Sequence, residues 1–168
     1  RMARDFRIES DSVYLLHAPM FFTAGGGGRF PCVMQGCRVL VTTYDTENIL
    51  GLIQKERVTH FTGSPTPIKR LAEHPDAAKY DLSSVRVIGL TGGTHSASEI
   101  RAIERVFGHV WYSSWGMTET CACGTMLPPE EVSLTGPLAK RVESIGKGQA
   151  GLDFIAVKDN GTEIKRDG

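Results

Sequence analysis

The residues WYSSWGMTET, at 111–120, carry the side chains in this chain that are best suited to chemistry. Trp115 offers an aromatic face that can stack on a purine. Thr118 and Glu119 offer a hydroxyl and a carboxylate, which suit phosphate oxygens and Mg2+, a cation that prefers hard oxygen ligands. Gly116 lets the backbone turn between them. The spacing predicts a loop that holds a nucleotide and its metal, although Glu119 alone would also suit the first turn of a helix.

A second candidate loop, TGGTHS at 91–96, lies between a strand-like run and a helix-like run. Gly92 and Gly93 would let the backbone approach a ligand closely, and the helix start behind them would present N–H groups to an anion or a polar ring. An ordinary strand-to-helix turn has the same composition, so both interpretations stay open for this segment alone. The dinucleotide fingerprint G-x-G-x-x-G fails, since Gly93 is followed by Thr, His and Ser.

Two other groups of residues are less informative. The run GGGG at 25–28 lacks the Lys-Ser/Thr ending of a phosphate-binding loop, and it predicts a tightly packed spot or a flexible bend. The four cysteines are Cys32, Cys37, Cys121 and Cys123. Their spacing does not match the paired knuckles of a structural zinc site, so we expect reduced thiols in a cytoplasmic protein.

The elements that must position the two loops alternate along the chain. Strand-like runs rich in Val, Ile, Thr and aromatic residues occupy 12–16, 37–43, 58–63, 85–90 and 109–114. Helix-like runs occupy 46–56, 64–74 and 96–108, and segment 19–36 is ambiguous. Thr46 is placed to cap the first helix, and Ser96 and Glu99 have capping-box spacing at the start of the last.

Strands that alternate with helices predict an α/β fold with a mainly parallel sheet flanked by helices on both faces. In such folds ligands collect at the carboxyl ends of strands, where both candidate loops lie. After residue 120 the pattern loosens, and we expect strands at 142–146 and 153–158 with a turn at 159–161. Residues 1–141 are therefore predicted to form an α/β sheet subdomain, and 142–168 the truncated start of a β-rich segment.

The composition argues against a nucleic-acid partner and against a membrane span. The formal net charge is +0 and the pI is about 7.1, so no basic field indicates a nucleic-acid partner. No apolar run approaches the roughly 18 to 20 residues that cross a bilayer, and we expect no membrane span. The first residues, RMARDFRIES, lack the apolar core of a signal peptide.

Taken together, five stretches resemble the adenylate-forming (AMP-binding) superfamily, in its acyl-CoA synthetase branch. VYLLHAPMFF is similar to that family's strand ending in Pro-x-Phe-His, GCRVLVTTYDTENILGLIQKERVTHFTGSPT to its Gly-x-x-V…Phe-Asp-x-Glu…V-T…Pro stretch, LSSVRVIGLTGGT to Leu-x-Ser-Leu-Arg…Gly-Gly-Ala, WGMTET to Tyr-Gly-x-Thr-Glu, and ESIGKGQAGLDFIAVKDNG to the Ser-x-Gly-x-Pro segment. The order and spacing of these motifs match across nearly the whole chain.

The resemblance implies that a carboxylic acid reacts with ATP to give an acyl adenylate, from which coenzyme A takes the acyl group. By motif position, the nucleotide-binding residues would be Gly92, Gly93, Thr94, Ser113, Ser114, Trp115, Gly116, Met117 and Thr118. Trp115 would stack where the family usually has Tyr. Thr118 and Glu119 would be catalytic, with Glu119 holding Mg2+. The acyl pocket would include Phe22, Gly92 and Met117.

Phe22 stands where the family's motif has His, and His17, five residues upstream, is not an obvious substitute. We interpret Phe22 as a wall of an apolar or aromatic acyl pocket. Amino-acid-activating domains of the superfamily have an Asp at about this place, so its absence argues against an α-amino acid substrate.

The family's phosphate-binding loop with its Lys would precede Arg1, and the ribose-binding Asp, the hinge and the catalytic Lys would follow Gly168. We therefore expect a central fragment of a larger ligase that lacks synthetase activity by itself. A non-catalytic nucleotide-binding or assembly module, and an adenylation domain serving a carrier protein, are the alternatives. The acid, the acceptor (coenzyme A or a carrier protein) and self-association into a homo-oligomer are open.

Overall fold

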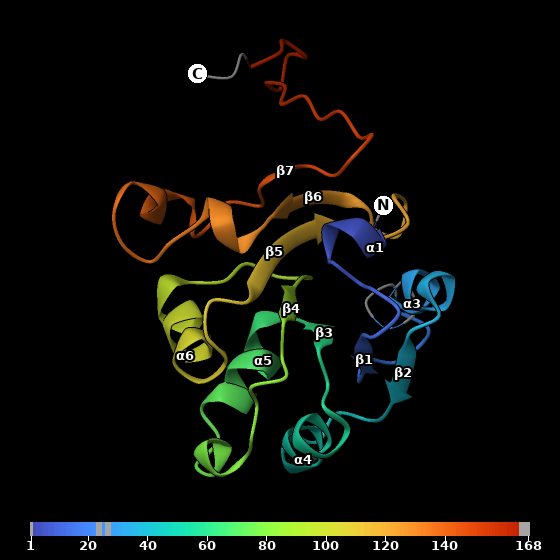
Figure 1. Ribbon diagram of the computed structural model, residues 1–168. Helices are drawn as coiled ribbons and strands as arrows, with labels where there is room; N and C mark the ends of the chain where they lie inside the picture. Colours follow the sequence, from blue (N-terminus) through green and yellow to red (C-terminus); the bar gives the residue numbers. More distant parts are fainter. Residues whose placement is uncertain (1, 23–24, 26–27, 165–168) are drawn as a thin grey trace.

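The computed structural model describes residues 2–22, 25 and 28–164, and a seven-stranded sheet forms its centre (Figure 1). The strands are β1 (Val13–Leu16), β2 (Arg38–Val41), β3 (His60–Gly63), β4 (Val87–Leu90), β5 (Trp111–Gly116), β6 (Gly124–Leu127) and β7 (Lys147–Gly148). The helices are α1 (Met2–Asp5), α3 (Arg29–Gln35), α4 (Thr46–Glu56), α5 (Pro65–Ala72) and α6 (Ala97–Phe107), with 3-10 turns η1 (Ala77–Lys79), η2 (Pro129–Glu131) and η3 (Pro137–Arg141).

The strands lie in the order β2-β1-β3-β4-β5-β6-β7. The pairs from β2 to β5 are parallel, and β6 and β7 add antiparallel pairs at one edge. The predicted mainly parallel α/β sheet is therefore confirmed. Each of the five predicted strands up to residue 114 occurs, within a few residues of its predicted bounds.

Helices cover both faces of this sheet (Figure 1). Because successive side chains of a strand point to opposite faces, Leu15 of β1 packs in the core under α4, α5 and α6, whereas Tyr14 and Leu16 pack in a smaller cluster with Cys32 of α3. Phe6, just after α1, belongs to the same smaller cluster. The larger core includes side chains of β4 and β5, the two strands that lead into the candidate loops.

Local signals set the helix boundaries. The capping box of α6 forms as predicted, with the Ser96 hydroxyl accepting from the Glu99 backbone N–H. The predicted cap of α4 is wrong by one residue, because the Asp45 carboxylate accepts from the Asn48 backbone N–H at 2.8 Å. Asp45 has extended backbone angles, which makes Thr46 the first helical residue instead.

The region after residue 120 departs most from expectation. Strand β6 was not predicted, and the predicted strand at 142–146 is wrong, since that segment forms turns before the short strand β7. The predicted strand at 153–158 is also wrong and reduces to a bridge between Val157 and Glu163. The turn at 159–161 is confirmed by a 2.8 Å hydrogen bond from the Gly161 N–H to the Lys158 carbonyl.

Two glycines of the GGGG run lie among the described residues, and both are closely packed. A Cβ on Gly25 would lie 2.2 Å from the Pro19 carbonyl oxygen, and one on Gly28 would lie 2.9 Å from the Tyr14 hydroxyl. Residues 26 and 27 lie outside the described residues. Gly28 therefore marks a place where the chain passes directly over the Tyr14 side chain.

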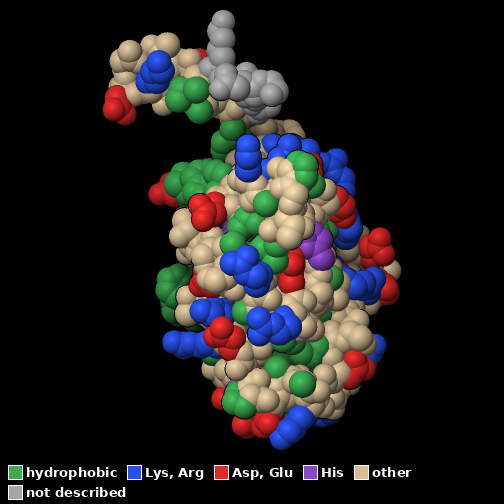
Figure 2. All heavy atoms as spheres, turned by 90° about the vertical axis from the view of Figure 1, so that its left-hand side faces the viewer, with side chains coloured by type: hydrophobic (Ala, Val, Ile, Leu, Met, Phe, Trp, Pro, Cys, Tyr) green, Lys and Arg blue, Asp and Glu red, His purple; other side chains and the backbone are tan. Residues whose placement is uncertain are grey.

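Charges are interspersed on the surface. On the face that Figure 2 shows, Lys and Arg side chains alternate with Asp and Glu side chains instead of forming one continuous field. Among the described residues, no helix has the length and apolar character needed to cross a bilayer.

The buried His60 makes fold stability depend on pH. Its Nε2 donates to the Phe6 carbonyl oxygen at 3.1 Å, and its Nδ1 lies 2.7 Å from the Thr59 hydroxyl. Burial lowers the pKa of His60 to about 4. The folded protein therefore keeps His60 neutral at a pH where the unfolded chain binds a proton.

We expect the free energy of unfolding to fall as the pH decreases from about 6.5 toward 4, with His60 contributing on the order of 3 kcal/mol. The His60→Gln variant should show a shallower slope in denaturant titrations across this range. His17 and His95 should maintain part of the slope, because burial lowers the pKa of each of them too. A slope unchanged in His60→Gln would contradict the assignment.

Candidate functional site

The two candidate loops follow adjacent parallel strands. Leu90 at the end of β4 is in register with Ser113 of β5, and β5 continues along β6 to Gly116, so the 91–96 loop lies beside the last residues of β5. The predicted meeting of these two loops is therefore observed.

One cavity, the Trp115 cavity, lies between these loops and has a volume of about 320 Å3. It is lined by Gly92, Gly93, Thr94, His95, Ser113, Ser114, Trp115, Gly116, Glu143 and Ile145. Seven of these residues were predicted to bind a nucleotide. Trp115 is 36% exposed as a residue, and its ring packs edge-on against Phe154 with ring centroids 6.1 Å apart.

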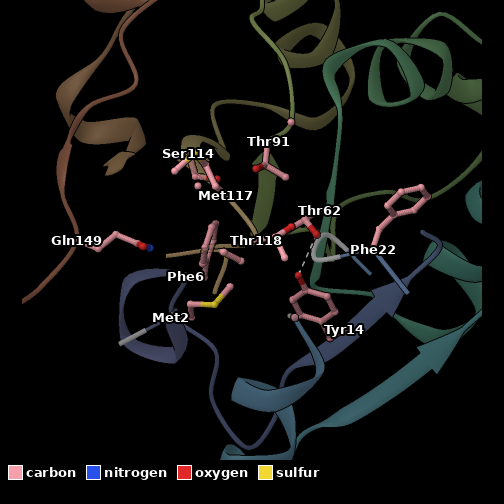
Figure 3. A pocket seen from close by; sticks show the side chains of 14 residues that line it. Met2, Phe6, Tyr14, Phe22, Thr62, Thr91, Ser114, Met117, Thr118 and Gln149 are labelled. Carbon is pink, nitrogen blue, oxygen red and sulfur yellow. Dashed lines mark hydrogen bonds between the residues drawn. The ribbon is translucent and has the colours of Figure 1, made fainter. Parts of the chain in front are cut away.

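A second cavity, the Tyr14 cavity, also has a volume of about 320 Å3 (Figure 3). It is lined by Met2, Phe6, Tyr14, Phe22, Gly28, Thr62, Thr91, Gly92, Ser114, Gly116, Met117, Thr118, Ala122 and Gln149. The predicted acyl-pocket residues Phe22, Gly92 and Met117 all line it, and so does Thr118.

The two cavities meet at three residues, since Gly92, Ser114 and Gly116 line both. Tyr14 and Tyr112 both pack on the α1 and α3 side of the sheet. Because successive residues of a strand point to opposite faces, Ser113 faces the other side. The cavities therefore open on opposite faces and join at the edge where the strands end. A ligand made of two parts could place one part in each cavity and its linkage at the junction.

The strand that carries Trp115 is held firmly at its start. Trp111 is fully buried, and its indole N–H donates to the Glu104 carboxylate of α6 at 2.8 Å. His95 packs edge-on against Trp111 with ring centroids 5.5 Å apart, and burial lowers the pKa of His95. His95 is therefore neutral, and it connects the 91–96 loop to β5.

The loop after β5 is a series of hydrogen-bonded turns. The Thr120 hydroxyl accepts from the Met117 N–H at 3.0 Å, and the Ala122 N–H donates to the Met117 carbonyl at 2.9 Å. Cys121 and Ala122 both have positive φ angles, 54° and 64°, which L-residues seldom adopt. Because the segment is not helical, the alternative role of Glu119 in a helix's first turn does not apply.

Glu119 lies on this turn with an exposed side chain and lines neither cavity. Among the described residues no group of three or more His, Cys, Asp or Glu side chains could hold a metal. A single exposed carboxylate beside the hydroxyl-bearing Thr118 fits Mg2+, which keeps several waters and is commonly bound by one or two carboxylates plus substrate phosphates.

Phe22 and His17 occupy different places. Phe22 is 58% exposed and packs on Phe21, with ring centroids 4.6 Å apart, at the rim of the Tyr14 cavity. His17 is buried against Tyr44 with ring centroids 5.6 Å apart, and it lines neither cavity. His17 therefore does not take the place of the histidine that the family's motif has at the position of Phe22.

Several lining residues were missed from the sequence. Tyr14 and Thr62 could have been found by assigning each strand residue to a face, because both point to the α1 and α3 side. Gln149 had no such signal. It follows the two-residue strand β7, and its side-chain oxygen accepts from the Gly124 N–H at 2.8 Å.

Comparisons with known proteins agree with this architecture. A family model described as AMP-binding enzyme matches residues 1–168. The chain is 31% identical over 137 residues to the 3-[(3aS,4S,7aS)-7a-methyl-1,5-dioxo-octahydro-1H-inden-4-yl]propanoyl:CoA ligase of Rhodococcus jostii (strain RHA1), covering 76% of this chain and 26% of that protein. It is 33% identical over 129 residues to pyochelin synthase PchD of Pseudomonas aeruginosa (strain UCBPP-PA14), covering 74% of this chain and 24% of that protein.

Among solved structures, the fold is similar to that of O-succinylbenzoate coenzyme A synthetase (MenE) from Bacillus subtilis, in complex with ATP and magnesium ion. The TM-score is 0.82 at 22% sequence identity, and the match covers 99% of this chain and 33% of the other. The chain spans about a quarter of the length of the curated relatives it matches. With the family model matching from residue 1 to 168, the chain belongs to the family of AMP-binding enzymes.

Proposed function

We propose that the chain is part of an ATP-dependent acyl-CoA synthetase, and that the junction of its two cavities is where the acid and the nucleotide react. The observation that carries this proposal is that Gly92, Ser114 and Gly116 line both cavities. An acyl adenylate is a ligand of matching design, with an apolar acyl group and a purine nucleoside joined through one phosphate. Its acyl group would occupy the Tyr14 cavity and its adenine the Trp115 cavity.

In the proposed reaction, a carboxylate oxygen bonds to the α-phosphorus of ATP while the bond to the bridging oxygen breaks and pyrophosphate leaves. The thiol of coenzyme A then loses its proton and replaces AMP at the acyl carbon. Trp115 would stack on adenine, and the Thr118 hydroxyl would donate to a phosphate oxygen as charge develops there. Glu119 is the residue that we propose to hold Mg2+, which when bound would neutralise phosphate charge.

The acceptor could differ, because one relative is named a pyochelin synthase and not a CoA ligase. An adenylation domain that passes its acyl group to a carrier protein is therefore the second candidate. Both candidates share the two-cavity site. A non-catalytic module would keep the fold without saturable nucleotide binding.

A calorimetric titration of the 168-residue chain with AMP tests the proposal. We expect saturable binding that Trp115→Ala weakens by roughly fivefold or more, because stacking a base on an aromatic side chain is worth about 1–3 kcal/mol. Trp115→Phe keeps an aromatic face and should retain most of the affinity.

We propose that this chain by itself gives no pyrophosphate exchange above background, so its nucleotide site is tested by binding and not by turnover. Exchange above background would contradict that part. Absence of saturable AMP binding, or an affinity that Trp115→Ala leaves unchanged, would contradict the assigned nucleotide site.

A further inference from the structure

A pair of hydroxyl groups lies in the wall of the Tyr14 cavity. The Tyr14 hydroxyl donates to Thr62 Oγ1 at 3.2 Å, and Figure 3 shows the two side chains converging at the cavity. Tyr14 is only 3% exposed, and burial raises its pKa, so its hydroxyl stays protonated and uncharged. The pair is a neutral polar group in a fixed place.

Two glycines set the direction of this pair. Gly89 is in register with Thr62 across β3 and β4, and a Cβ on Gly89 would lie 2.6 Å from Thr62 Cγ2. The methyl group of Thr62 therefore fills the space above Gly89. On the other side, a Cβ on Gly28 would lie 2.9 Å from the Tyr14 hydroxyl. The absence of a side chain at Gly28 and Gly89 thus leaves the space that the Tyr14 ring and the Thr62 methyl group occupy.

The other walls of the cavity combine apolar side chains with four polar ones, those of Thr91, Ser114, Thr118 and Gln149. Met2, Phe6, Phe22, Met117 and Ala122 contribute side chains that offer contact area to a hydrocarbon group. A hydroxyl can donate once and accept twice, and Tyr14 uses one acceptor position of Thr62. The Thr62 O–H can therefore donate to an acceptor atom of a ligand in this cavity.

The free-energy cost of leaving the Thr62 O–H without an acceptor can make the cavity selective between ligands. A ligand that fills the cavity with hydrocarbon would leave the Thr62 O–H without an acceptor, which is less favourable than pairing it. Sites that are built to hydrogen-bond a substrate discriminate against analogues that lack the matching atom for this reason.

We propose that the Tyr14–Thr62 pair selects acids whose acyl group carries a hydrogen-bond acceptor, such as a ketone or ether oxygen, over hydrocarbon acids of the same length. This inference rests on the proposed function, because it assigns the acyl group to the Tyr14 cavity. Thr62 is the residue that contacts the acceptor, and Tyr14 is a positioning residue that holds its oxygen.

Acyl sulfamoyl adenosines, which are stable mimics of acyl adenylates, test the inference on the 168-residue chain. One series carries straight-chain oxo acyl groups in which the ketone moves along the chain, and the other carries hydrocarbon groups of equal length. For at least one ketone position we expect the oxo probe to bind about three- to tenfold more tightly than its hydrocarbon partner.

The ratio of the two affinities is the readout for variants. Thr62→Val keeps the side-chain shape but removes the donor, and it should bring the ratio close to one. Thr62→Ser is the matched control and should retain the preference. Because Thr62→Val also removes the acceptor of the Tyr14 hydroxyl, the double variant Tyr14→Phe with Thr62→Val serves where the single variant does not fold, and it should likewise lose the preference.

The outcomes separate the two proposals. If AMP and the hydrocarbon probes bind but every oxo probe binds equally well, the selectivity inference is wrong and the proposed function stands. A preference that survives in Thr62→Val would also overturn the inference. If neither AMP nor any acyl sulfamoyl adenosine binds, the proposed function fails and this inference fails with it.

Discussion

Replacement of Trp111 with alanine is expected to lower the free energy of unfolding by about 3 to 5 kcal/mol, a large fraction of the stability of an ordinary domain. Trp111 is fully buried at the start of β5, and the rings of His95 and His109 pack edge-on against it. Truncation would leave a cavity in the main core. It would also leave the Glu104 carboxylate without the indole N–H that donates to it at 2.8 Å.

The chain contains its own control, because its second tryptophan lies on the same strand. Trp115 is 36% exposed, and Trp115→Ala should change the free energy of unfolding by no more than about 1 kcal/mol. Urea titrations followed by far-ultraviolet circular dichroism would measure both variants without relying on tryptophan fluorescence. Equal losses of stability in the two variants would contradict the packing described for β5.

The second large effect is expected at Gly146, which precedes β7. Gly146 has a φ angle of +80°, and an added Cβ would lie 2.0 Å from the Met126 carbonyl oxygen and 2.5 Å from the Leu127 nitrogen. Because these neighbours are backbone atoms of β6, they cannot rotate away. We expect Gly146→Ala to cost roughly 2 to 5 kcal/mol, combining a left-handed backbone with overpacking.

The variant Gly36→Ala separates the cost of a left-handed backbone from the cost of overpacking. It also has a positive φ angle, +67°, but no atom within 4 Å of an added Cβ, so Gly36→Ala should cost only about 1 to 2 kcal/mol. Gly146→Ala should in addition displace Gln149 from the Gly124 N–H and loosen one wall of the Tyr14 cavity. Thermal unfolding and amide exchange at Gly124 would measure the two effects, and equal costs at the two glycines would contradict the predicted clash.

Sequence patterns predicted the parallel part of the sheet because its strands and helices follow simple rules. Apolar strand runs were bounded by turn residues, and Ser96 with Glu99 defined a helix start through hydrogen bonds that are local in sequence. The strand β6 was missed because its sequence, GTML, begins with glycine and offers only two consecutive apolar residues, too short a run to indicate a strand. At 142–146 the apolar residues favoured a strand, but the positive φ of Gly146 turns the chain there.

The site was predictable only where it is local. Gly92 and Trp115 lie on loops that directly follow strands, so the rule that ligands gather at strand ends applied to them. Alternation along each strand could have assigned Tyr14 and Thr62 to one face, but their contact depends on the pairing of β1 with β3, which the sequence pattern does not specify. The contribution of Gln149 depends on a hydrogen bond to β6, which no short-range pattern encodes.

The placement of the two cavities on opposite faces of one sheet has a consequence for how such a protein can diversify. Neighbouring residues of a strand face different chambers, so a substitution that reshapes one chamber need not disturb the other. Changes at Tyr14 or Thr62 should therefore combine additively with changes at Ser113, whereas changes at the shared Gly92 or Gly116 should not. Under the proposed function, the acid and the nucleotide would be selected by separate cavities, and the two preferences could be altered independently.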